Sequence, residues 1–194
     1  YFLGRKELFK GLKIDSMEKD WNIHPVFHVD FNATNFTVPG ELEQKIRYHV
    51  SEWEKRYGLP CRESELGIGD RFAEVIRASH EQTGKRAVVL VDEYDKPILD
   101  VLDVDSSLED RHRNVLKAFY SVFKVADSHL QFVLLTGVTK FSQVSVFSGF
   151  NQPKDISMDA RYETICGITQ KELESYFAEP ISAMAERFRC SMEE

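Results

Sequence analysis

The chain has 194 residues, of which 42% are hydrophobic and 14 are Phe, and its formal net charge is −7. This length suffices for one domain with a hydrophobic core, and the apolar content excludes a disordered chain. The negative charge disfavours a protein whose whole surface binds nucleic acid or membranes.

The N-terminal segment, the apolar runs and the cysteines give information on cellular location. No apolar run approaches the roughly 20 residues needed to cross a bilayer, and the opening YFLGRKELFKGL has no signal-peptide pattern. The three cysteines, Cys61, Cys166 and Cys190, are scattered without zinc-ligand spacing, which favours reduced thiols and a cytoplasmic location. The first residue is Tyr1 rather than Met, so we expect the natural start to lie upstream.

The first half of the chain predicts two strands separated by two helices. The segment HPVFHVDF (24–31) is rich in β-branched and aromatic residues, which favours a strand. Apolar residues at helical spacing predict a helix over 39–58 and another over about 70–83, with Gly84 as C-terminal cap. The apolar run that follows predicts a buried strand over 86–92.

The second half continues this alternation. A capping box, Ser106-Ser107-Leu108-Glu109, predicts the start of a long helix, and 131–137 is a second apolar strand. Residues 141–160 are rich in Ser, Asn, Gly and Asp, which is typical of a long irregular loop.

A short strand and a capped helix are expected near the C-terminal end. The strand is ETICGI (163–168), and a second capping box, Thr169-Gln170-Lys171-Glu172, opens the helix, which should break or kink at Pro180. Alternating strands and helices, with two strands apolar throughout, predict an α/β fold with a parallel sheet covered on both faces.

Polar side chains follow three of the strands where each one ends. They are Asp30, Asp92 with Glu93, and Thr136. The carboxyl ends of parallel strands form one edge of a sheet, where ligands bind, so these residues should line one edge.

The strand VVLVDE fits the Walker B pattern of nucleotide hydrolases, in which four apolar residues precede Asp-Glu. In that interpretation Asp92 holds Mg²⁺, usually through water, and Glu93 deprotonates the water that attacks a phosphate. The alternative is an ordinary acidic turn at a strand end, and Asp95 fits turn chemistry better than catalysis.

The next strand ends in Thr136 and continues as Gly137-Val138-Thr139-Lys140. In nucleotide hydrolases the strand beside the acidic one often ends in a polar residue that senses the γ-phosphate. Thr136 and Thr139 are candidates for this hydrogen bond, and Lys140 for added positive charge. A glycine-containing turn with a solvated lysine is the alternative interpretation.

The phosphate-binding loop that should accompany these residues is missing from the sequence. A P-loop reads G-x-x-x-x-G-K-[ST], because backbone amides, a lysine and a hydroxyl together hold the phosphates and Mg²⁺. Gly84-Lys85 is followed by Arg86, and no glycine of the chain opens the motif.

Several stretches resemble the predicted AAA-ATPase-like family of bacterial proteins, over essentially the whole chain. They include VVLVDEYDKPILD, FVLLTGVTKFSQVSVFSGFNQPKDIS and YETICGITQKELESYF. The resemblance implies a P-loop NTPase-like, mostly parallel sheet with helices on both faces, here lacking the P-loop strand and helix. It also implies Mg²⁺ and ATP as cofactors of the intact protein, and often a nuclease-like domain of the PD-(D/E)XK type beyond the C-terminal end.

The resemblance also suggests how the chain is divided. Residues 1–168 would be the Walker B and sensor half of an ATPase core, and residues 169–194 a helical segment. Since the P-loop strand of such ATPases lies beside the sensor strand, we expect a gap in the sheet, pairing of 131–136 with 163–168, or a strand from another chain.

The leading hypothesis is therefore a fragment of an ATPase that in intact form hydrolyses Mg-ATP to drive conformational change, and that is inactive alone. The alternative is a non-enzymatic scaffold or regulatory module with a vestigial nucleotide site. A nuclease is disfavoured, because the Glu-x-Lys at 43–45 lies on a predicted helix. Expected partners are a nucleotide, a protein client, a fused nuclease-like domain or a second copy of the chain, with nucleic acid only indirectly and no membrane.

Overall fold

The computed structural model describes residues 1–138 and 153–189. Contacts between residues divide the chain into two compact units, Tyr1–Asn151 and Gln152–Glu194. A domain boundary after residue 168 stays a prediction, and most of the loop predicted over 141–160 lies outside the described residues.

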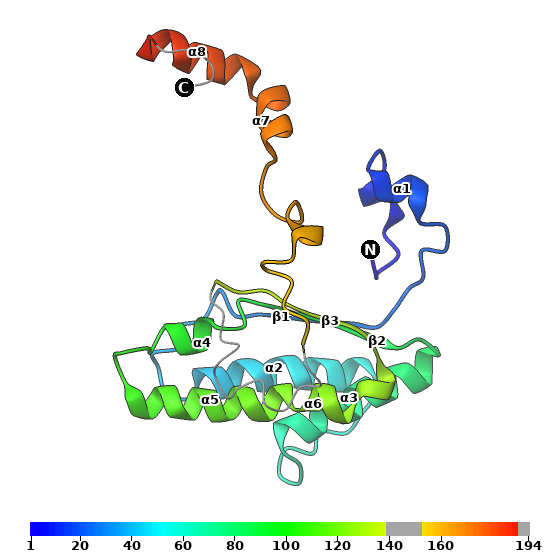
Figure 1. Cartoon of the computed structure of the whole chain (residues 1–194). Helices are drawn as coiled ribbons and strands as arrows, with labels where there is room; N and C mark the ends of the chain where they lie inside the picture. The colour runs from blue at the N-terminus through cyan, green and yellow to red at the C-terminus, as the bar shows by residue number, and fades with distance from the viewer. Residues whose placement is uncertain (139–152, 190–194) are drawn as a thin grey trace. The chain divides into compact units, whose positions relative to one another are not determined.

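The first unit contains a parallel sheet of three strands in the order β1-β2-β3 (Figure 1). The strands are β1 (Val26–Asp30), β2 (Ala87–Asp92) and β3 (Leu130–Leu135). Each lies within one or two residues of a predicted strand, so the α/β class with a parallel sheet is confirmed.

One face of this sheet packs against the long helices of the unit (Figure 1). These are α2 (Glu41–Arg56), α3 (Ile68–Thr83) and α5 (Ser106–Tyr120), which the short α6 (Val122–Val125) continues. The core between sheet and helices contains fully buried apolar side chains, among them Phe27, Val29, Leu42, Val50, Phe72, Val89, Leu116 and Phe119.

The opposite face of the sheet is covered much less. It carries the N-terminal segment, with the short helices η1 (Lys6–Phe9) and α1 (Lys13–Met17). Phe2 makes the contact, since its ring centroid lies 5.7 Å from that of Phe132. Phe132 is nevertheless 41% exposed and Leu134 36% exposed, so this face of the sheet is only partly covered.

Local signals placed the helix ends with mixed success. Gly84 ends α3 in the left-handed conformation at φ +67°, as predicted, and its N–H donates to the carbonyl of His80 at 2.8 Å. The capping box at Ser106 is wrong, because the cap is Asp105, whose carboxylate accepts from the Leu108 N–H at 2.9 Å. The aspartate one residue earlier thus takes the N-cap role that was predicted for the serine.

In the second unit, η5 (Ala160–Tyr162) precedes α7 (Gln170–Tyr176) and α8 (Ala178–Phe188). The capping box of Thr169 and Glu172 is confirmed. The helix breaks at Phe177 and not at Pro180, because Pro180 lies in the first turn of α8, where its missing N–H has no intrahelical partner to lose.

The strand predicted over 163–168 is wrong, and so is its pairing with β3. These residues form turns and bends, with Gly167 at φ +91°. Ile165 and Ile168 are 62% and 61% exposed, so no neighbouring strand or core covers the apolar pattern that suggested a strand. Among the described residues, the sheet ends at β3.

Candidate functional site

The three strands bring their polar ends to one edge of the sheet. Asp30 and Asp92 are register partners on β1 and β2, and Leu135 is the partner of Val91, so Thr136 follows at the same level. The Thr136 N–H donates to the Val91 carbonyl at 2.9 Å, which extends the pairing past the end of β3. The predicted convergence of these residues at one edge is therefore observed.

Asp92 and Thr136 are in direct contact at this edge. The Thr136 hydroxyl donates a hydrogen bond to Oδ1 of Asp92. The Asp92 side chain is half-buried, whereas Thr136 is exposed. The hydrogen bond orients the carboxylate and engages only Oδ1, at a position open to solvent.

Glu93 lies on a strained turn directly after β2. Its φ is +54°, in the left-handed region that residues with a side chain rarely adopt, at a cost of about 1–2 kcal/mol. The Glu93 carbonyl accepts from the Lys96 N–H at 3.1 Å, where the chain turns into α4 (Lys96–Leu99). Strain of this kind is retained where surrounding contacts enforce it, often at functional sites.

Those contacts come from the segment after β3. The Tyr94 N–H donates to the Thr136 carbonyl at 2.9 Å. A Cβ on Gly137 would lie 2.5 Å from Oδ1 of Asp95 and 2.7 Å from the ring of Tyr94, so any side chain there would have to displace these two groups. Asp95 is fully buried and its carbonyl begins α4 by accepting from Ile98 and Leu99. The turn after β2 therefore packs closely against the turn after β3.

Sequence reasoning missed this close packing. It treated Asp95 as turn chemistry and gave Gly137 no role. The available signal was a glycine directly after the polar end of an apolar strand, since a glycine there is typical of close approach by another backbone or side chain.

Two further contacts stabilise the turn that follows β2, residues 93–96. The buried Tyr120 hydroxyl donates to the Tyr94 carbonyl at 3.3 Å, and burial raises the pKa of this phenol well above its ordinary value, so it remains a donor. Lys96 pairs with Asp100 at 2.7 Å, and Asp100 also accepts from the Phe36 N–H at 3.3 Å. The loop after β1 is thereby tied to α4.

The oxygens at this edge suit a hard cation better than zinc. In the described parts, residues 1–138 and 153–189, no three His, Cys, Asp or Glu side chains converge as a metal cluster. Mg²⁺ does not need one, because it keeps several waters and takes one or two protein carboxylates. The Asp92 carboxylate, oriented by the Thr136 hydroxyl, fits that requirement. Thr139 and Lys140 lie outside the described residues.

Comparison with known proteins identifies the family. The family described as predicted AAA-ATPase, AAA-ATPase-like, matches residues 1–147. The chain belongs to this family. An uncharacterized protein of Azotobacter chroococcum mcd 1, from the region 5′ of vnfD, is 41% identical over 181 residues. That alignment covers 91% of this chain and 34% of the relative, so the chain spans about a third of the relative's length.

Two further findings concern solved structures and the helices of the chain. No solved structure matches the chain. Within the part of the chain that the structure describes, no helix has the length and apolarity required to cross a membrane.

Proposed function

We propose that this chain is the Walker B and sensor part of an ATPase that binds Mg-ATP and hydrolyses the bond between the β- and γ-phosphates. The observation that carries the proposal is the contact at the sheet edge, where Thr136 donates to Asp92 beside Glu93. Membership of the AAA-ATPase-like family supports the same assignment.

Each residue at this edge has a distinct task in the proposal. Asp92 would hold Mg²⁺ directly or through water, and the ion would supply positive charge for the phosphates there. Glu93 accepts a proton from the attacking water and is held in place by its strained turn. Thr136 orients Asp92 and hydrogen-bonds the γ-phosphate region, with Thr139 and Lys140 as further phosphate contacts.

The phosphate loop must come from residues outside this sequence. Residues 1–194 contain no G-x-x-x-x-G-K-[ST] motif, and the relative from A. chroococcum is about three times as long as the aligned region. We therefore expect the isolated chain not to hydrolyse ATP. In the longer protein, hydrolysis would drive a conformational change in a protein client or a fused nuclease-like domain.

ATP turnover by the complete gene product tests the proposal. Glu93→Gln should retain Mg-ATP binding and reduce turnover by roughly 10²–10⁴-fold, because it removes only the general base. Glu7→Gln, an exposed acid on η1, is the matched control and should leave turnover unchanged. Equal turnover in Glu93→Gln and wild type would refute the role of Glu93.

The missing motif also favours a second candidate, a non-enzymatic scaffold or regulatory module with a vestigial site. A fluorescent-nucleotide titration separates the two. Mg-dependent ATP binding by the complete protein, weakened by Asp92→Asn and unaffected by Asp103→Asn, supports the ATPase. Absence of binding by the complete protein supports the scaffold.

A further inference from the structure

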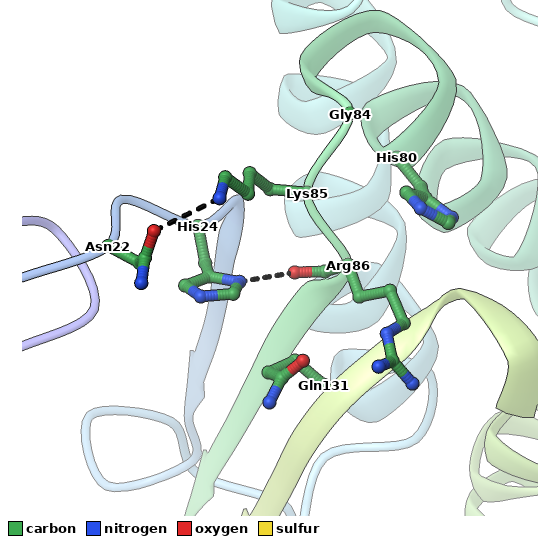
Figure 2. A pocket seen from close by; sticks show the side chains of 7 residues that line it. All are labelled: Asn22, His24, His80, Gly84, Lys85, Arg86 and Gln131. Carbon is green, nitrogen blue, oxygen red and sulfur yellow. Dashed lines mark hydrogen bonds between the residues drawn. The ribbon is translucent and has the colours of Figure 1, made fainter. Parts of the chain in front are cut away.

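A second site lies at the opposite end of the sheet, where the strands begin. A cavity of about 330 Å³ opens there beside the N-terminal end of β2 (Figure 2). Its lining comes from four separate segments and includes Asn22, His24, His80, Lys85, Arg86 and Gln131. Every one of these side chains carries nitrogen, and no carboxylate lines the cavity.

The cations of this cavity stand out in an acidic protein. Among the described residues, no carboxylate forms an ion pair with Lys85 or Arg86. Most other arginines of the first unit are paired with Glu, namely Arg47, Arg62, Arg71, Arg77, Arg111 and Arg113. Two uncompensated cations beside imidazoles therefore create a local positive potential on a chain of net charge −7.

Hydrogen bonds hold several of these groups in fixed orientations. Nδ1 of His24 donates to the Arg86 carbonyl at 2.8 Å, which holds the imidazole in one orientation at the cavity. The Lys85 ammonium donates to Oδ1 of Asn22 at 3.0 Å, which engages the amide oxygen and leaves its NH₂ as the outward group. Figure 2 shows both contacts at the rim of the cavity.

The imidazoles of His80 and His129 form a hydrogen-bonded pair at the cavity. Their Nδ1 atoms are 3.0 Å apart, so one ring donates and the other accepts. The pair fixes the orientation of the His80 ring, which lines the cavity between α3 and Arg86.

We propose that this cavity binds a small molecule with a dianionic phosphate group, a phosphomonoester or a pyrophosphate. The guanidinium of Arg86 supplies a two-pronged contact to phosphate oxygens, and the Lys85 ammonium supplies a further charge-assisted hydrogen bond. The volume lies at the lower end of small-molecule sites, which suits a phosphorylated metabolite. A single concave pocket on a chain of net charge −7 does not provide the extended basic track that a nucleic-acid backbone needs.

This site is separate from the proposed nucleotide site. Arg86 precedes β2 and Asp92 ends it, which at about 3.3 Å per residue puts roughly 20 Å between the two ends. Anion binding here requires neither Mg²⁺ nor a phosphate loop, so the two proposals can fail independently.

Titration of residues 1–194 with inorganic phosphate and with pyrophosphate, without Mg²⁺ and at constant ionic strength, tests the proposal. Binding is followed by calorimetry and by the side-chain NMR signals of the six histidines. We expect saturable binding that shifts the His24 and His80 signals. Arg86→Gln should weaken it by about tenfold, and Lys85→Gln should weaken it independently, because each removes a charge-assisted hydrogen bond. Lys124→Gln, at an exposed lysine of α6, is the matched control.

Three outcomes would overturn the proposal. The first is no saturable binding of either anion, and the second is equal affinity in Arg86→Gln and wild type when circular dichroism shows both folded. The third is binding that Asp92→Asn abolishes and Arg86→Gln does not, which would place the anion at the other edge. A single-stranded oligonucleotide that binds through Arg86 when pyrophosphate does not would assign the pocket to nucleic acid instead.

Discussion

At the residue scale, Gly137 is the position where the two turns of the candidate site meet. A Cβ added there would lie 2.5 Å from Oδ1 of Asp95 and 2.7 Å from the ring of Tyr94, closer than Cβ contacts in proteins. The first prediction is that Gly137→Ala lowers the free energy of unfolding by about 1–3 kcal/mol, since the added methyl group displaces the buried Asp95 and the half-buried Tyr94. Chemical denaturation measures the change.

Gly67→Ala is the control for this prediction. A Cβ there would meet only Oδ2 of Asp70, at 3.5 Å, and the backbone φ is negative. The control should change stability by less than about 1 kcal/mol, mainly through the weaker N-cap preference of alanine. If Gly137→Ala is no more destabilising than Gly67→Ala, the two turns are not packed as described.

The backbone of Glu93 gives a second prediction at this scale. Glycine adopts φ +54° without a Cβ clash, so Glu93→Gly should raise the stability of residues 1–194 by about 1 kcal/mol. The same substitution in the complete protein should abolish ATP turnover, because the proposed base is gone. A gain in stability with a loss of activity is the expected trade-off where strain serves function.

Asp103→Gly separates backbone strain from side-chain effects. Asp103 also has positive φ, at +59°, and lies in the turn between α4 and α5. It should gain stability in the same direction without affecting turnover. A loss of stability in Glu93→Gly would show that contacts of the Glu93 side chain outweigh its backbone strain.

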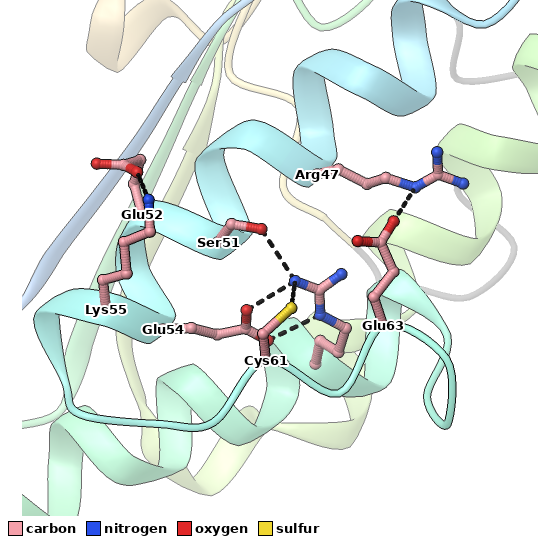
Figure 3. Close-up of polar contacts among 8 residues, drawn as sticks. Arg47, Ser51, Glu52, Glu54, Lys55, Cys61 and Glu63 are labelled. Carbon is pink, nitrogen blue, oxygen red and sulfur yellow. Dashed lines mark hydrogen bonds and ion pairs between the residues drawn. The ribbon is translucent and has the colours of Figure 1, made fainter.

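At the element scale, a buried ion pair joins α2 to α3. The Arg71 guanidinium donates to both carboxylate oxygens of Glu54, at 2.7 and 2.6 Å, and to the Ser51 hydroxyl at 3.0 Å. Figure 3 shows Ser51, Glu54 and Cys61 directed at this guanidinium. Arg71 and Glu54 are only 2% and 4% exposed, and the hydrogen bonds that Arg71 donates to Glu54 raise the pKa of Arg71.

The third prediction concerns this pair. Arg71→Met should destabilise the fold by about 3–5 kcal/mol, because it leaves the Glu54 carboxylate buried without a partner. The double variant Glu54→Leu/Arg71→Met should recover most of that loss, since two apolar side chains then fill the space. Urea denaturation of both variants measures the difference.

An exposed pair on the same helix is the control. Arg77 and Glu81 are four residues apart on α3 and 3.2 Å from each other, with about half of each side chain exposed. Arg77→Met should cost less than about 0.5 kcal/mol. Comparable losses in Arg71→Met and Arg77→Met would mean that the buried pair adds nothing beyond a surface contact.

The elements themselves were largely predictable because their signals are local. Helical periodicity located α2 and α3, and Gly84 marked a helix end through its own backbone freedom. The strand predicted over 163–168 failed because a strand is stable only beside another, and an apolar pattern does not reveal whether a neighbour exists.

The position of the candidate site was predictable from the sequence, but its side-chain contacts were not. The order of strands placed Asp30, Asp92 and Thr136 at one edge, because parallel strands end together. The hydrogen bond from Thr136 to Asp92, the fit at Gly137 and the gathering of Lys85 and Arg86 near His80 depend on side-chain distances across elements. No spacing along the sequence encodes those distances.

At the scale of the whole molecule, the outer edge of β3 is the feature that most constrains how the protein assembles. Among the described residues, β3 pairs with β2 alone, and the exposed Phe132 and Leu134 lie on the less covered face of the sheet. An unpaired strand edge beside exposed apolar side chains recruits further strands. In the proposed ATPase, this edge receives the strand that carries the phosphate loop.

The last prediction follows from this edge. Residues 1–194 alone should associate with increasing concentration, and Leu134→Lys should reduce that association, because a lysine beside the edge opposes pairing with another chain. Val125→Lys is the matched control, since Val125 is 75% exposed and lies on α6 rather than on a strand. Sedimentation velocity of the three proteins measures the outcome. A wild-type chain that stays monomeric at every concentration, or an equal effect of both lysines, would contradict an adhesive β3 edge.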